Sequence, residues 1–269
     1  MLVKAVSLLI VWITGKRRRF INPWQNYLLY AKQYYGIEFS MFSFNESDLG
    51  IDVLHTPQEH ADFIKEFGAY LAGLNLPTRM LLGDNSDATT FDFILPALNN
   101  LETHKYIGAV SFHSWRGCDD VTLKKWADAA KAINVPLLVG EGSTDAAAHG
   151  YAEIFNESTF ALYEINLYTR ICAICQPLSI LQWQLTSDYS LLWGDGIYGS
   201  KGPLRPTQRF WNIKQLASTP ADALAIPVSS SKKNVNCAAF GNMVRGEYAV
   251  HMVNNGQIAR RSSPVSLQK

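Results

Sequence analysis

Residues 106–141 read YIGAVSFHSWRGCDDVTLKKWADAAKAINVPLLVGE, and this stretch decides the fold. Two apolar runs within it, 106–112 and 136–139, have the length and composition of buried strands. A helix is predicted to begin between them at Asp119-Asp120, because the apolar residues that follow recur at helical spacing. These apolar residues are Leu123, Trp126, Ala130 and Ile133. A strand, a helix and a second buried strand form a right-handed crossover, which places both strands in parallel in one sheet.

The same alternation of strand and helix continues on both sides of this stretch. Strands are predicted at 37–44, 79–82 and 178–181, and helices from Thr56-Pro57 and over 159–175. Polar residues follow every strand, near positions 46, 84, 113, 141 and 183. Polar residues at the carboxyl ends of parallel strands are typical of a (β/α)8 TIM barrel or a doubly wound sheet. No G-x-G-x-x-G or P-loop follows a strand, which disfavours a nucleotide-binding sheet.

The chain is predicted to divide into three parts. Residues 1–20 combine a short apolar run with the basic cluster Lys16-Arg17-Arg18-Arg19. The run is shorter than the roughly 20 residues that span a bilayer, so we interpret it as a degraded secretion signal or an apolar helix. Residues 21–218 are predicted to form a partial barrel, and residues 219–269 an incomplete β-sandwich-like module. A helix at 206–217 ends the barrel, and the strands of the module are expected at 235–240 and 248–253.

The composition excludes several classes of protein. With 48% apolar and 17% charged residues the chain is globular, and its net charge of +1 argues against binding nucleic acid or an anionic membrane. Four cysteines are too few for a disulfide scaffold. Cys172 and Cys175 form a C-x-x-C in an apolar helical stretch, and we predict buried, inert thiols there.

Two glutamates at strand ends are the candidate catalytic residues. Glu46 follows Asn45 after the first strand, and Glu141 ends the strand three units further on. Two carboxylates at nearby strand ends of a barrel suit a retaining glycosidase, in which they stand about 5–5.5 Å apart. One attacks the anomeric carbon, and the other protonates the leaving oxygen. Taken singly, each glutamate could instead cap a helix or face solvent.

The order and spacing of these residues resemble a clan A glycoside hydrolase, over roughly residues 37–217. In that clan the acid/base follows an asparagine at the end of strand four, which matches Asn45-Glu46. The nucleophile ends strand seven, which matches Glu141, and a tryptophan commonly ends strand eight, which matches Trp183. The trailing strands after the barrel resemble the family 30 type, whose barrel carries a side β-sandwich.

The sequence also departs from the clan pattern. Counted from Glu46, it has strands four to eight and nothing recognisable as strands one to three, so the arginine of strand two is absent. Asp84 stands where many members have histidine, and His113 stands where many have tyrosine to orient the nucleophile.

Further residues are expected to bind substrate. Asn45 is expected to hold a sugar hydroxyl, and His113 to bond to Glu141 or to the sugar. Trp115 and Trp183 are expected to stack on sugar rings, although packing roles remain open for His113 and Trp115. Asp84 and Asp87 are expected to serve loops and helix caps rather than a cation, so no metal and no cofactor are predicted.

The resemblance implies retaining hydrolysis of a β-linked glycan by Glu141 as nucleophile and Glu46 as acid and base. The alternatives are an inactive barrel fragment that binds carbohydrate weakly or needs a partner chain, and an unrelated open α/β protein. Five parallel strands expose sheet edges, which would favour self-association. A secreted or periplasmic location is suspected if the full-length protein carries a signal peptide. The sugar and its linkage are not predicted.

Overall fold

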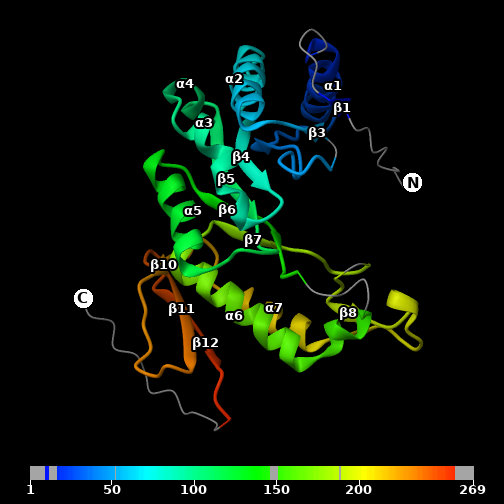
Figure 1. The fold of residues 1–269 in the computed structure, drawn as a ribbon, viewed down its shortest axis with the longest axis vertical. Helices are drawn as coiled ribbons and strands as arrows, with labels where there is room; N and C mark the ends of the chain where they lie inside the picture. The colour runs from blue at the N-terminus through cyan, green and yellow to red at the C-terminus, as the bar shows by residue number, and fades with distance from the viewer. Residues whose placement is uncertain (1–9, 12–16, 52, 146–150, 188, 258–269) are drawn as a thin grey trace. The chain divides into compact units, whose positions relative to one another are not determined.

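The computed structural model of the chain describes residues 10–11, 17–51, 53–145, 151–187 and 189–257 (Figure 1). The chain divides into two compact units. The first comprises Met1–Asp145 with Pro177–Trp183, and the second comprises Ala146–Gln176 with Gln184–Lys269.

A five-stranded parallel sheet forms the centre of the first unit, in the order β2-β4-β5-β6-β7. Its strands are β2 (Met41–Phe42), β4 (Arg79–Asn85), β5 (Ile107–His113), β6 (Leu137–Gly142) and β7 (Ser179–Gln182). The five predicted strands are confirmed, and they form the predicted part of a TIM barrel. The prediction of a strand over 37–44 is wrong in length. Only two residues pair in β2, because the chain then turns and brings Glu46 to a φ of 50°.

Two helices bury apolar side chains in the core of the first unit. Helix α2 (Pro57–Gly73) begins with the expected capping box between Thr56 and Glu59, and its Ile64 is fully buried. Helix α5 (Asp120–Ala132) begins at the N-cap Asp119 and buries Trp126, as its spacing predicts. Short helical turns that the sequence analysis did not predict connect β4 to β5. They are η1 (Ala88–Ile94), α3 (Leu95–Leu98) and α4 (Leu101–His104).

The N-terminal part of the first unit differs from the prediction. Helix α1 (Arg17–Tyr35) contains part of the basic cluster, and the short strand β1 (Ile10–Val11) pairs in parallel with β3 (Val53–Leu54). Most of the apolar run at the N-terminus lies outside the described residues. Hydrophobic periodicity did not predict α1, because Pro23 lies inside this helix and several aromatic side chains of the helix are exposed.

The second unit combines helices with a small antiparallel sheet in the order β10-β11-β12. Its elements are η3 (Ala152–Asn156), α6 (Ser158–Cys175), β8 (Leu192–Trp193), η4 (Ile197–Gly199), β9 (Arg205–Pro206), α7 (Gln208–Leu216), β10 (Leu224–Ile226), β11 (Val235–Asn242) and β12 (Glu247–Asn254). The two strands predicted for the antiparallel module are confirmed as β11 and β12, which pair antiparallel, and β10 adds a third strand.

Polar and thiol groups are also buried in the second unit. Arg209 of α7 is fully buried and forms a bidentate ion pair with Glu164 of α6, at 2.7 and 2.9 Å. Cys172 and Cys175 are buried as predicted, and burial raises the pKa of the Cys172 thiol to about 12. Among the described helices, none combines the length and apolar character that a bilayer crossing requires.

Candidate active site

Four ionisable side chains meet at the carboxyl end of the parallel sheet. Glu46 follows β2, Asp84 lies in β4, His113 ends β5 and Glu141 lies in β6. The carboxyl ends of parallel strands share one edge of the sheet, so residues far apart in sequence become neighbours. The first unit therefore brings together the two glutamates that the sequence analysis paired.

His113 is the centre of this group. Its Nδ1 lies 3.1 Å from Oε1 of Glu46 and 3.3 Å from Oε2 of Glu141. Its Nε2 lies 3.3 Å from Oδ1 of Asp84, and its side chain has no exposed surface. The expected contact between His113 and Glu141 is therefore present, together with two further carboxylates.

These carboxylates set the charge of His113. Burial lowers its pKa, but the hydrogen bonds to Asp84 and Glu46 and the charge of Glu141 outweigh burial and raise the pKa to about 9. The ring is consequently an imidazolium at neutral pH. Both of its nitrogens then carry protons and donate to the carboxylates around them.

Glu141 accepts hydrogen bonds on both carboxylate oxygens. Asn45 Nδ2 donates to Oε1 at 3.3 Å, and Trp115 Nε1 donates to Oε2 at 3.1 Å. Burial raises the pKa of Glu141, whereas His113 and these two donors act against that rise. The carboxylate is thus partly desolvated and held in place by three neighbouring side chains.

Asp84 supports His113 from β4. Burial would raise the pKa of Asp84, but His113 and the Ser111 hydroxyl, which donates at 2.9 Å, together hold that pKa below its ordinary value. Gly140 leaves room for this contact, since a Cβ atom there would lie 2.2 Å from Oδ1 of Asp84. Asp84 is therefore an anion beside the imidazolium at neutral pH.

One atom each of Glu46, His113 and Glu141 lie within 4.8 Å of one another, a separation that could also hold a cation. The hydrogen bonds described above fit two carboxylates around an imidazolium better than a metal centre. Asp87 has the predicted capping role, because it accepts the Thr89 N–H at 2.8 Å at the start of η1.

The predicted substrate-binding residues differ in their placement. Asn45, His113 and Trp115 contact the glutamate pair directly. Trp183 follows β7, where its backbone N–H donates to the carbonyl of Gly142 at 2.8 Å, and the residue is 39% exposed. The stacking role of Trp183 stays a prediction.

Asp84 was not among the predicted site residues. The signal that could have identified it is its position, since it follows a strand at the same level as the three other ionisable residues. Ser111 lies inside a strand and gave no such signal.

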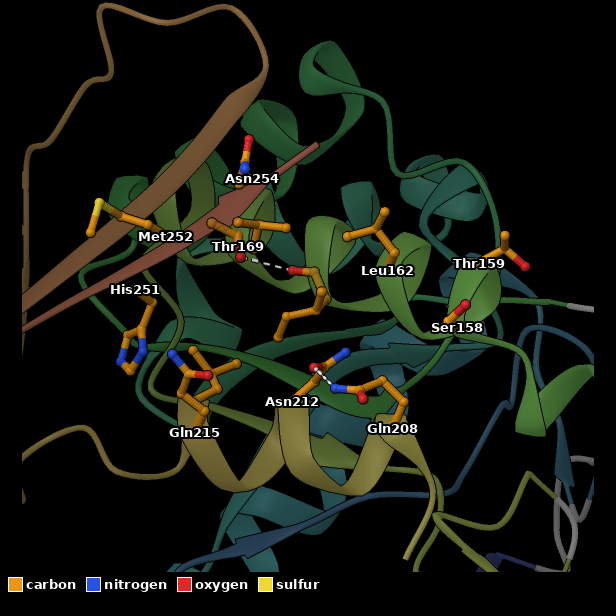
Figure 2. A pocket seen from close by; sticks show the side chains of 13 residues that line it. Ser158, Thr159, Leu162, Thr169, Gln208, Asn212, Gln215, His251, Met252 and Asn254 are labelled. Atoms are coloured by element: carbon orange, nitrogen blue, oxygen red, sulfur yellow. Dashed lines mark hydrogen bonds between the residues drawn. The ribbon is translucent and has the colours of Figure 1, made fainter. Parts of the chain in front are cut away.

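The second unit contains a cavity of about 400 Å³ (Figure 2). Side chains of α6, α7 and β12 line it, including the amides of Gln208, Asn212 and Asn254 and the ring of His251. None of the predicted site residues lines this cavity.

Several solved structures share the fold. The glycoside hydrolase family 30 subfamily 8 xylanase Xyn30A from Clostridium acetobutylicum matches with a TM-score of 0.71 and 14% identity, over 91% of this chain and 58% of that chain. The catalytic domain of the family 30 xylanase C from Talaromyces cellulolyticus matches with a TM-score of 0.62 and 18% identity, over 88% and 55%. A family 39 β-xylosidase from Caulobacter crescentus matches with a TM-score of 0.57 and 14% identity, over 82% and 53%.

These matches show a shared fold. The chain spans 53–58% of the length of the three enzymes. Its resemblance to clan A glycoside hydrolases, with family 30 among the matches, is confirmed at the level of the fold. A scan against protein-family models finds no match, and a search of curated proteins finds none either.

Proposed function

We propose that this chain hydrolyses β-linked glycosides by a retaining mechanism, with Glu141 as nucleophile and Glu46 as acid and base. One observation carries the proposal, namely that oxygens of Glu46 and Glu141 approach within 4.8 Å of each other beside His113. Retaining glycosidases hold their carboxyl groups about 5–5.5 Å apart, whereas inverting enzymes need about 6.5–9.5 Å for a water molecule. The short separation favours direct attack by a carboxylate.

The hydrogen bonds support this assignment of roles. Both oxygens of Glu141 accept N–H groups, from Asn45 and Trp115, and these donors stabilise the anion that a nucleophile must be. Glu46 bonds to His113 through Oε1, and no described residue donates to its Oε2. That second oxygen is the one we assign to carry the proton for the leaving group.

Two displacements complete the proposed reaction. In the first, Glu141 forms a bond to the anomeric carbon while the glycosidic bond breaks and Glu46 gives its proton to the departing oxygen. In the second, Glu46 takes a proton from water, the water oxygen bonds to the anomeric carbon, and the bond to Glu141 breaks.

The surrounding residues are proposed to orient these groups. The imidazolium of His113 lies beside Glu141, and its charge stabilises the anion of this nucleophile. Asn45 is proposed to hold the hydroxyl at carbon 2 of the sugar, where hydrogen bonds strengthen towards the transition state. Trp183 is proposed to form a wall of the sugar subsite.

The similar structures suggest which substrates to test first. Two of those described are xylanases and one is a β-xylosidase, so we propose β-linked xylose units as the first candidate. The test compares the hydrolysis of aryl β-xylosides and aryl β-glucosides that have the same leaving group. Faster hydrolysis of the xylosides would support this candidate, and similar rates would indicate a general β-glycosidase.

The test is hydrolysis of these aryl glycosides by wild-type protein and by Glu46→Gln and Glu141→Gln variants. Each variant is expected to lose roughly 10²–10⁴-fold in kcat, as removal of a covalent or acid–base group predicts. Glu102→Gln makes the same chemical change in the exposed helix α4 and should keep wild-type turnover. Full turnover in Glu141→Gln would refute the assignment.

Azide separates the two roles. With Glu141→Ala, azide can take the place of the missing nucleophile and give a glycosyl azide of inverted configuration. With Glu46→Ala, azide attacks the glycosyl-enzyme and gives a product of retained configuration. The opposite pair of outcomes would exchange the roles of the two glutamates.

A second candidate is a chain that binds carbohydrate without turnover or needs a partner chain. It is favoured by Leu178, which directly precedes the edge strand β7, and by Leu181 within that strand, because these residues are 65% and 54% exposed. A folded wild type without turnover, whose mass in solution exceeds that of one chain, would support this candidate over the first.

A further inference from the structure

Strand β4 contains a bulge beside the proposed active site. Its register against β5 shifts between Gly83 and Asn85, so Asp84 is an extra residue in the strand. Gly83 and Asp84 have φ angles of 94° and 60°, in the left-handed region. Bulges occur next to active sites because they redirect a side chain. Here the redirected side chain is the carboxylate that contacts Nε2 of His113 at 3.3 Å.

The bulge positions two parts of the site at once. The side chain of Asp84 bonds to His113, and its carbonyl accepts the backbone N–H of Glu46 at 3.1 Å. A shift of the bulge would therefore move both the anion beside the imidazolium and the backbone that carries Glu46. A left-handed conformation costs aspartate less than most residues but is still less favourable than the right-handed one, so contacts with neighbouring residues help to hold it.

His60 of α2 provides such a contact. The N–H of Gly83 donates to Nε2 of His60 at 3.0 Å, and the His60 side chain is buried. Burial and then the nearby His55 lower the pKa of His60 to about 3, against the effect of Asp84. The ring is therefore neutral near pH 7, and its Nε2 lone pair is available to accept.

We propose that His60 is a positioning residue of the active site, which holds the bulge through Gly83 and so directs Asp84 towards His113. None of its described hydrogen bonds reaches Glu46 or Glu141, so it acts on them only through the bulge. The catalytic meaning of this inference rests on the proposed function, whereas its geometry does not.

Three variants test it, with the His113 pKa measured by NMR and the pH profile of kcat as readouts. His60→Leu removes the acceptor and is expected to weaken proton binding by His113 about tenfold or more, a fall of one pKa unit. The alkaline limb of the kcat profile should move with it, while KM changes less than about twofold. His60→Gln can still accept from Gly83 and should keep the titration of His113 within about twofold of wild type.

Phe93→Leu is the matched control. Its ring packs 4.9 Å from that of His60, so the variant loosens the same region of the core and leaves the bond to Gly83 intact. It should lower stability without moving the titration of His113. An unchanged His113 titration in folded His60→Leu would overturn the proposal, as would an equal fall in Phe93→Leu.

Two outcomes remain, namely a His60→Leu variant that does not fold and a wild type without turnover. If His60→Leu does not fold, scalar coupling across the hydrogen bond from the Gly83 amide to His60 Nε2 is measured in the wild type. Its absence overturns the proposal, and its presence with a retained His113 titration in His60→Gln supports it. A wild type without turnover on any aryl glycoside contradicts the proposed function alone, because the titration of His113 is read without substrate.

Discussion

Replacement of His113 by glutamine is expected to remove a pH-dependent part of the folding free energy. The three carboxylates around the ring raise its pKa to about 9, whereas an unfolded chain leaves histidine near 6.5. A group whose pKa is raised on folding stabilises the protein fully below the unfolded pKa. This stabilisation is lost as the pH rises through the folded pKa, here between pH 6.5 and about 9.

The magnitude follows from the two pKa values. An interval of roughly two and a half pKa units corresponds to roughly 3 kcal/mol, at 1.36 kcal/mol per unit. The side chain is fully buried, so solvent does not screen this interaction. The unfolding free energy of wild type minus that of His113→Gln should therefore fall by roughly 3 kcal/mol between about pH 6 and about pH 10.

The assay is urea unfolding of both proteins across this pH range, followed by circular dichroism. Asp84→Asn provides an independent route, because it removes the strongest partner of His113, and asparagine tolerates the left-handed backbone at this position. The unfolding free energy of Asp84→Asn should also depend less on pH than that of the wild type. Gln58→Ala, in the exposed face of α2, should keep the wild-type dependence. A constant difference between wild type and His113→Gln over the whole range would refute the reasoning.

Three further changes test other contacts. Trp115→Phe keeps an aromatic ring but removes the N–H that donates to Glu141, so the pKa of Glu141 should rise further. The kcat/KM for aryl β-glycosides should fall about tenfold, because a hydrogen bond to a charged group is lost. Gly140→Ala places a Cβ against the carboxylate of Asp84 and should lower the unfolding free energy by about 1–3 kcal/mol, measured in urea. The same variant should lower the pKa of His113, measured by NMR. Glu164→Gln leaves the buried guanidinium of Arg209 without its anion and should cost about 3–5 kcal/mol by the same urea assay.

Each change has a control of the same chemical kind. Trp211→Phe alters a half-exposed tryptophan of α7, and Gly73→Ala adds a Cβ where no atom lies within 4 Å. Asp222→Asn breaks an exposed pair with Arg245 and should cost about 1 kcal/mol or less. A control that matched its test variant would show that the named contact is not the cause.

The sheet could be predicted from the sequence because the features that indicate its strands and the connecting helices are local. The strands around residues 79, 107 and 137 are apolar runs, and the helices between them have caps and helical periodicity that do not depend on the rest of the chain. The glutamate pair was predictable for a related reason, because parallel strands bring their carboxyl ends to one edge.

The position of Asp84 at a strand end was predictable in this way, but its contact with His113 was not. This contact depends on a bulge and on two consecutive positive φ angles, which hydropathy patterns do not encode. Helix α1 was not predicted, because it contains Pro23 and exposed tyrosines and therefore does not show a clear apolar stripe in the sequence. The contact from His60 to Gly83 joins residues 23 positions apart, and only the packing of α2 on β4 brings them together.

The ionic composition of the group around His113 also bears on which ligands it selects. The carboxylates of Asp84 and Glu141 beside one imidazolium leave a net negative charge even when Glu46 carries the proton assigned to it, in a site with little solvent. Protonated imino sugars should therefore bind more tightly than neutral sugars of the same shape, and sugars that carry a carboxylate at the reacting ring should be repelled. In the proposed reaction the sugar gains positive charge as its bond to the leaving group breaks. The same field therefore favours the transition state over the neutral substrate.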